Sequence, residues 1–163
     1  MPLFTALLEN GRNGYTGDSR GVALTFSIAA ADILSVITTD IVRRNCDFAD
    51  CIARWLRDPE AGGQWYELVN GSRSSSERAV PLNIVLFRGK NNSRFPPEDP
   101  TSAGRLVKAI NDTRRIFVTI TSWEGIGAVR IAVSNWRTAN GEGGVEASSE
   151  LVEVKGVLSE VMQ

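Results

Sequence analysis

The clearest pattern along the chain is an alternation of bulky and small side chains over residues 128–134, AVRIAVS. The odd positions carry bulky apolar residues and the even positions carry an arginine or small residues: Val129, Ile131 and Val133 against Arg130, Ala132 and Ser134. Side chains of a β-strand alternate between the two faces of a sheet, so this pattern predicts a strand with one buried face. Arg130 then lies on the opposite face, which we expect to be open and polar.

Other apolar patterns predict the remaining elements. Strands are expected at residues 64–69, 81–87 and 115–121, and the last of these forms a hairpin with residues 128–134 across SWEGIG. Apolar residues at three- and four-residue spacing predict helices at residues 41–57, from Thr101 onward and at residues 145–161. A short helix is expected at residues 2–11, where Gly11 would end it.

The order of these elements defines a fold class. From residue 41 it runs helix, strand, strand, helix, strand, strand, helix, with strands in antiparallel pairs. Such a chain buries one sheet face under its helices. We therefore predict an α+β two-layer sandwich, in which a mainly antiparallel sheet of about four strands carries helices on one face.

Composition narrows the chemistry. The chain has 163 residues and 42% hydrophobic residues, enough for one soluble globular domain. Its 18 Lys and Arg balance 19 Asp and Glu, so charge gives no reason to expect a nucleic-acid or membrane partner. Because there is no histidine, the chain can form neither a histidine triad nor a histidine-containing zinc site. No metal site is expected.

Cysteines and the amino terminus suggest a cytoplasmic protein. Cys46 and Cys51 are five residues apart in a predicted helix, a spacing that suits no disulfide, so we expect two buried thiols in a reducing compartment. The amino terminus has no basic region followed by an apolar stretch, and therefore no secretory signal is expected. The most apolar run, residues 22–37, contains Asp32 and is short for a membrane span, which disfavours an anchor.

The arginine on the small-residue face has two interpretations. A guanidinium with free space around it can form a two-pronged contact with a carboxylate or a phosphate. The simpler alternative is ordinary solvent exposure of an antiparallel sheet face, which is the commoner situation. Residue patterns alone leave both open.

Several stretches resemble a known family. RRIFVTITSWEGIGAVRIAVSNWRT, with the terminal SSELVEVKGVLSEVM, closely resembles the small domain of the group II pyridoxal-phosphate-dependent decarboxylases, such as the aromatic amino acid and glutamate decarboxylases. PLNIVLFRGK resembles the family's apolar strand ending in Phe-Arg, and DIVRRNCDFADCIARWL resembles its interdomain helix. The most specific part is SNWRT after the arginine-bearing strand.

This resemblance implies a function for the intact enzyme. Residues 41–163 would be the carboxy-terminal small domain of a fold type I enzyme, which closes over an active site in a large pyridoxal-phosphate-binding domain. The intact enzyme would be a homodimeric carboxy-lyase that removes carbon dioxide from an amino acid. Arg130 matches the arginine that pairs with a substrate carboxylate in glutamate-decarboxylase-like relatives, so the resemblance assigns it to substrate binding.

The first departure from the family is an additional segment. In relatives a stretch like GRNGY continues almost directly into one like TDIVRRN, whereas here residues 16–39 lie between them. This segment has the apolar bias of neither a linker nor a clean helix. We therefore expect residues 1–40 to be a helix remnant with an atypical insertion, which an unspliced intron or a lineage-specific insertion would both produce.

The second departure concerns the catalytic lysine. The family's Schiff-base lysine follows a histidine, and this chain has no histidine. Its three lysines, Lys90, Lys108 and Lys155, fall in a predicted loop and two predicted helices. We therefore expect no catalytic or cofactor-binding residue in this chain, no activity of the chain alone, and a truncated or misassembled decarboxylase.

Other residues are weaker candidates. Arg88, at the end of a predicted strand, could face the same site or be a solvated strand end. Trp123 and Trp136 flank the hairpin strand and suit either a domain interface or ordinary edge packing. A second function fits the same sequence: an interaction module without catalysis, which docks on a full-length decarboxylase or self-associates through exposed residues such as Phe87 and Trp123.

Overall fold

The structure is a computed structural model that describes residues 19–71, 78–80, 82–135 and 144–163, with side chains from residue 35 onward. The helix expected at residues 2–11 lies outside these residues. The contacts of the chain divide it into two units, Met1–Ile37 and Thr38–Gln163, and the second unit contains the sheet. The domain boundary expected at residue 40 stays a prediction.

A four-stranded antiparallel sheet forms the centre of this unit. The strands are β1 (Tyr66–Leu68), β2 (Ile84–Gly89), β3 (Thr119–Trp123) and β4 (Ile126–Ala132), in the order β1-β2-β4-β3. All three neighbouring pairs are antiparallel. The predicted hairpin is confirmed, but its turn is shorter than SWEGIG. Only Glu124 and Gly125 lie between β3 and β4. Both have left-handed backbone, with φ of 52 and 80, as in a type I′ hairpin turn.

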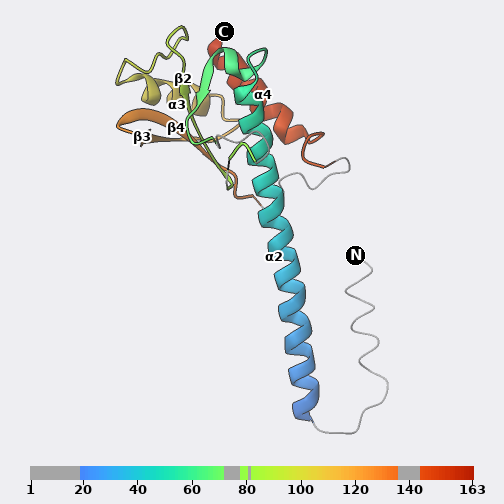
Figure 1. The fold of residues 1–163 in the computed structure, drawn as a ribbon. Helices are drawn as coiled ribbons and strands as arrows, with labels where there is room; N and C mark the ends of the chain where they lie inside the picture. The colour runs from blue at the N-terminus through green and yellow to red at the C-terminus, as the bar shows by residue number, and fades with distance from the viewer. Residues whose placement is uncertain (1–18, 72–77, 81, 136–143) are drawn as a thin grey trace. The chain divides into compact units, whose positions relative to one another are not determined.

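Helices cover one face of this sheet (Figure 1). They are the carboxy-terminal part of α2 (Ser19–Arg57), α3 (Ser102–Asp112) and α4 (Ser149–Met162), and a short 3₁₀ helix, η1 (Gly62–Gln64), precedes β1. Their apolar faces meet the sheet in one cluster, whose most buried large members include Ile52, Leu56, Tyr66, Phe87, Leu106, Ile110, Val129, Leu151 and Leu158. The predicted α+β sandwich is therefore confirmed.

Helix α2 is longer than the sequence pattern suggested. The predicted helix at residues 41–57 is its carboxy-terminal part, and the helical backbone begins at Ser19. The expectation that residues 16–39 do not form a clean helix is therefore wrong from Ser19 onward. The spacing of apolar residues did not indicate a helix in this segment, because small and β-branched residues are spread over it without forming one apolar face. No helix in the described part of the chain is long and apolar enough to cross a membrane.

Tyr66 connects the sheet to the last helix. Its side chain is 1% exposed and packs edge-on against the Phe87 ring, with 5.2 Å between the ring centres. Its Oη donates a hydrogen bond to the Leu158 carbonyl at 2.9 Å. Burial raises the pKa of the Tyr66 hydroxyl well above its ordinary value. The hydroxyl therefore stays protonated and keeps donating to α4.

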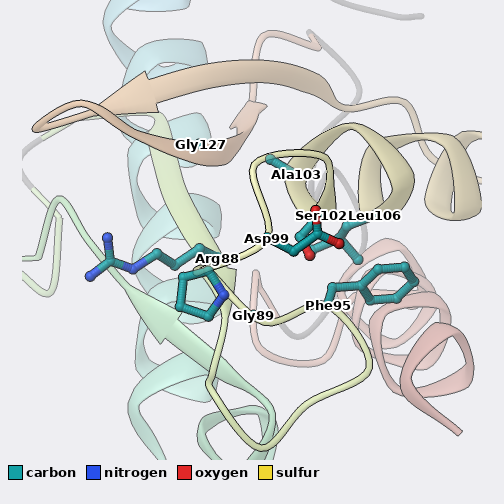
Figure 2. A pocket seen from close by; sticks show the side chains of 9 residues that line it. Arg88, Gly89, Phe95, Asp99, Ser102, Ala103, Leu106 and Gly127 are labelled. Carbon is teal, nitrogen blue, oxygen red and sulfur yellow. The ribbon is translucent and has the colours of Figure 1, made fainter.

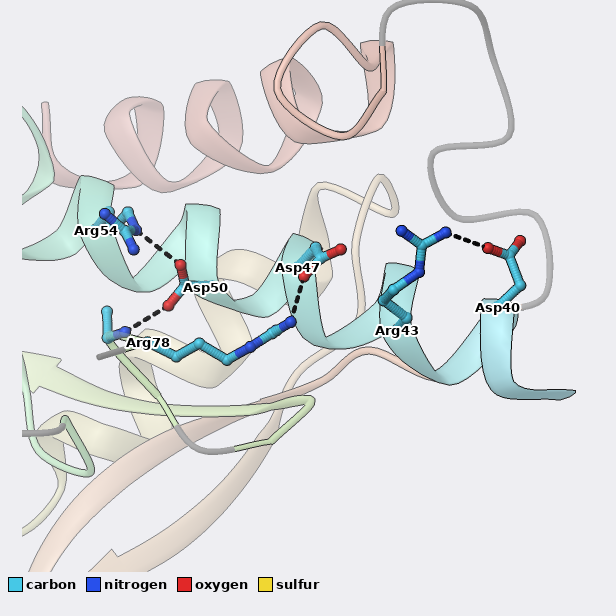
Figure 3. Close-up of polar contacts among 7 residues, drawn as sticks. Asp40, Arg43, Asp47, Asp50, Arg54 and Arg78 are labelled. Atoms are coloured by element: carbon cyan, nitrogen blue, oxygen red, sulfur yellow. Dashed lines mark hydrogen bonds and ion pairs between the residues drawn. The ribbon is translucent and has the colours of Figure 1, made fainter. Parts of the chain in front are cut away.

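Asp50 fixes the loop that leads into β2 (Figure 3). Its carboxylate is on the buried side of α2, accepts a hydrogen bond from the backbone N–H of Ala79, and pairs with Arg54 Nε at 2.7 Å. One turn earlier, Asp47 pairs with Arg78 from the same loop at 2.5 Å. Both aspartates connect α2 to this loop, but only Asp50 is also buried. We therefore expect Asp50 to stabilise the fold more than Asp47 does.

Replacing Asp50 should therefore destabilise the protein measurably. Asp50→Ala leaves the buried Ala79 N–H without its acceptor and should cost about 2 kcal/mol of unfolding free energy. The measurement is urea unfolding followed by circular dichroism. Asp50→Asn, which keeps an acceptor oxygen, should lose less. Asp112→Ala, which removes the exposed pair with Lys108, is the control, and equal urea midpoints for the two alanine variants would contradict this role.

Candidate functional site

The sheet face away from the helices is the candidate site, and we call it the outer face. Strand alternation and register place three rows of side chains on it. The rows are Leu82, Ile84, Leu86 and Arg88 along β2 and its approach; Ile126, Ala128, Arg130 and Ala132 along β4; and Phe117, Thr119, Thr121 and Trp123 along β3 and its approach. Leu86 and Ala128 are buried, yet neither belongs to the core beneath the helices.

Arg130 lies near the middle of the outer face. It is opposite Leu86 on one neighbouring strand and Thr119 on the other. Val129 and Ile131, on either side of it, point into the core, so the predicted facing of this strand is confirmed. The Arg130 side chain is exposed and has no hydrogen-bond or ion-pair partner among the described residues. Its guanidinium is therefore available to an anion from outside the domain.

The outer face is less polar than the sequence pattern suggested. Of the exposed large apolar side chains in the sheet region, four lie on this face: Leu82 at 60% exposure, Phe117 at 78%, Trp123 at 37% and Ile126 at 39%. The expectation of an open, polar face is therefore wrong, because it considered β4 alone. The same alternation in IFVTITSW places Phe117 and Trp123 on the same face as Arg130, and this signal was present in the sequence.

Arg88 is also on the outer face but is already neutralised. Its Nε donates to Glu67 on β1 at 2.8 Å, a pairing that follows from the register in which Glu67 lies opposite Arg88. Its side chain is 20% exposed. A shallow groove lined by Arg88, Glu67, Trp123 and Glu124 runs beside this pair. Arg88 is therefore a weaker anion site than Arg130.

Of the two tryptophan candidates, the structure describes only Trp123. Trp123 is paired in register with Ile126 at the hairpin turn and is partly exposed on the outer face, as an interface residue would be. Trp136 lies outside the described residues. Phe87, named in the alternative interpretation as an exposed residue, is wholly buried because it points to the helices. The exposed aromatic that matters is Phe117.

A pocket between β2 and the start of α3 is too small for a ligand (Figure 2). Gly89, Phe95, Asp99, Ser102 and Leu106 line it, and its volume of about 10 Å³ is room for roughly one water molecule. Hydrogen bonds from the hydroxyl and backbone N–H of Thr101 lower the pKa of the Asp99 carboxyl, so it stays charged at the amino end of α3. Asp99 therefore stabilises the turn that leads into α3.

A second groove lies between α2 and α4. It contains Cys51, Trp55, Glu146 and Lys155. Burial, and then the charges of Glu146 and Asp50, raise the pKa of the Cys51 thiol, so the thiolate is disfavoured there. Both cysteines are free, and both are half-buried where full burial was expected. The groove has no activated nucleophile, and the described residues contain no group of metal-ligating side chains.

The lysines do not fit a covalent cofactor site. Lys90 Nζ donates to the Gly63 carbonyl, and Lys108 Nζ pairs with Asp112 at 2.6 Å on the exposed side of α3. Lys155 lines the groove between the two helices, away from the outer face. None of these contacts places a lysine amine beside Arg130 on the outer face.

The fold defined by these elements is an antiparallel four-stranded sheet with helices on one face, and solved structures share it. Catharanthus roseus tryptophan decarboxylase in complex with L-tryptophan matches with a TM-score of 0.52 and 19% identity, over 76% of this chain and 21% of that chain. Oryza sativa TDC with PLP matches with a TM-score of 0.50 and 23% identity, over 76% of this chain and 24% of that chain.

These similarities establish the fold, and the function has to be argued from the site. The chain spans only about a fifth to a quarter of the solved structures that it matches. No family model and no curated protein matches the sequence.

The placement of the lysines predicts how the chain responds to pyridoxal phosphate. Mixing the purified chain with the cofactor, followed by borohydride reduction and intact-mass measurement, should give no stoichiometric adduct. The amines of Lys90 and Lys108 are engaged by the Gly63 carbonyl and the Asp112 carboxylate, and Lys155 lies in an open groove. Partial labelling of the exposed Lys108 is expected and should disappear in Lys108→Arg. One adduct per chain at a single lysine would contradict this assignment.

Proposed function

We propose that this chain acts as the small domain of a pyridoxal-phosphate-dependent amino acid decarboxylase, with its outer face packed against a larger cofactor-binding domain. The observation that carries the proposal is the apolar rim of the outer face, formed by Leu82, Phe117, Trp123 and Ile126. A sheet that leaves such residues exposed around a central arginine has the composition of an interface. The shared fold and the sequence resemblance supply the class of partner.

The role of Arg130 follows from the cost of covering this face. A partner that packs on the apolar rim removes Arg130 from water, and a buried guanidinium without an anion is strongly unfavourable. Arg88 already has Glu67, so an incoming carboxylate is needed at Arg130 alone. We infer that this carboxylate belongs to the amino acid substrate, which a two-pronged contact would hold in a fixed orientation.

In this proposal the chain orients the substrate, and the larger domain carries out the bond breaking. Pyridoxal phosphate would supply the electron sink from the larger domain, and the intact enzyme would be a cytoplasmic homodimer. The outer face would shield the substrate carboxylate from water, while Arg130 would bind it. The chain alone would be inactive because it brings no lysine to this face.

The same apolar rim also favours a second candidate. The chain could be a module without catalytic contribution that docks on a full-length decarboxylase or covers its own outer face. In that case Arg130 would pair with a carboxylate of the partner protein. The two candidates differ in whether replacing Arg130 changes turnover or only binding.

Packing through the outer face predicts which residues matter for docking. The chain would be co-expressed with the cofactor-binding part of a tryptophan decarboxylase that lacks its own small domain, and complex formation measured by size-exclusion chromatography. Phe117→Lys should weaken association at least about tenfold, because it places a charge in the apolar rim. Val152→Lys changes another exposed apolar residue, on α4 and outside this face, and should have no effect. Equal association of both variants with the partner would exclude the outer face.

The role of Arg130 predicts a kinetic defect without loss of cofactor. In a chimeric decarboxylase that carries residues 41–163 as its small domain, Arg130→Met should lower kcat/KM at least about a hundredfold, because a buried charge-assisted contact is lost. The cofactor absorbance should remain. Arg114→Met, which removes an exposed arginine between α3 and β3, is the control. Unchanged kinetics with Arg130→Met would favour the non-catalytic module.

A further inference from the structure

Strand β3 is an edge of the sheet, and no other described strand pairs with its outer side. It is last in the order β1-β2-β4-β3, and its residues are exposed or half-exposed along its whole length. Residues 116–123, IFVTITSW, contain no charged residue, no proline and no glycine. Natural edge strands are usually interrupted by a charge, a proline or a bulge, because a free edge pairs with other chains. Here none of these is present.

The opposite edge is different. Strand β1 has only three residues, and Glu67 in its middle is held by Arg88. Short, charged edge strands are poor templates for pairing. Of the two edges, β3 is therefore the one that can pair with an additional strand.

The free hydrogen-bonding groups of this edge can be assigned. In a hairpin with a two-residue turn, Trp123, Thr121 and Thr119 exchange hydrogen bonds with β4, so the groups of Ser122, Ile120 and Val118 point outward. The N–H and C=O of Val118 are both taken by the Asn111 side chain, at 2.9 and 3.0 Å. Within the described part of the chain, no contact of this kind occupies Ile120 or Ser122.

We propose that β3 pairs with β3 of a second copy of this chain, antiparallel and with Thr121 on the two-fold axis. Ile120 of each copy then lies opposite Ser122 of the other. Since each of these residues exchanges both backbone groups, the pairing forms four hydrogen bonds and leaves none of the free edge groups unused. The capped Val118 sets where this ladder ends.

The side chains agree with this register. Thr119 lies opposite Trp123 of the other copy, Phe117 opposite the small Gly125, and Glu124 opposite the apolar Val118. No like charges face each other, and an uncharged strand meets its own copy without repulsion. The half-exposed Ile120, 58% accessible in the single chain, gains cover. The resulting interface is small, so the dimer should be weak and concentration-dependent.

This inference does not rest on the proposed function, because its hydrogen bonds are formed by backbone groups of the β3 edge, whereas docking of a larger domain uses the apolar side chains of the outer face. A two-fold axis perpendicular to the sheet keeps both outer faces on the same side of an enlarged sheet. Each face would still be free for a larger domain. Failure of the docking experiment with Phe117→Lys would therefore leave the edge pairing unaffected, and the reverse also holds.

The position of Thr121 on the axis gives a sharp test by sedimentation equilibrium of the purified full chain. The unmodified chain should dimerise with increasing concentration. Thr121→Lys and Thr121→Glu should each be monomeric, because each places two like charges opposite one another. An equimolar mixture of the two variants should restore a dimer. Thr119→Lys, which adds the same charge opposite Trp123, should still dimerise.

A second pair of variants tests the backbone contacts. Ser122→Pro removes an outward N–H that β4 does not use, and proline is tolerated at such edge positions. It should weaken dimerisation about 30-fold, as expected for one hydrogen bond lost in each copy. Ser122→Thr keeps the N–H and should behave like the unmodified chain. A monomer at every soluble concentration, or a dimer that survives both Thr121→Lys and Ser122→Pro with circular dichroism unchanged, would overturn the proposal.

Discussion

The structure depends on the packing of the sheet centre against the helices. Phe87 and Val129 lie opposite each other in register and are both fully buried beneath α2, α3 and α4. Because side chains alternate along a strand, fixing this pair to the helix side also fixes Leu86, Arg88, Ala128 and Arg130 on the other side. A register slip of one residue would bury both arginines. The position of the candidate site is thus a consequence of the core.

Most of the fold was accessible from the sequence because it follows from local patterns. The alternation around Arg130, the helical spacing in residues 41–57 and the glycine-containing turn each report a structure formed by neighbouring residues. Four strands, the hairpin and the helices on one face were all predicted in this way. The turn was predicted too long because Glu124 is an unusual residue for a left-handed backbone position. In the structure β3 continues to Trp123 and β4 begins at Ile126.

The parts that were not predicted arise from contacts between distant segments. Arg88 is neutralised only because β1, which contributes Glu67, pairs with β2 in a particular register. The polarity of the outer face was misjudged because Leu82 and Phe117 reach it from segments that precede their strands. The capping of Val118 by Asn111 needs the end of α3 to lie beside β3. The Glu67–Arg88 and Asn111–Val118 contacts have no signature in a single stretch of sequence, whereas the facing of Phe117 could be predicted from the alternation in IFVTITSW.

The outer face and the β3 edge differ in the chemical groups that they expose, and they therefore favour different kinds of partner. The edge offers neutral backbone groups, so its partner needs only a matching strand, and a second copy provides one. The outer face combines apolar side chains, which favour removal from water, with an unpaired guanidinium, which opposes it. A partner can gain the apolar contact only if it also brings an anion to Arg130. A face of this kind is selective by its own composition: it rejects purely apolar surfaces and accepts a surface, or a surface with a bound substrate, that carries a carboxylate at its centre.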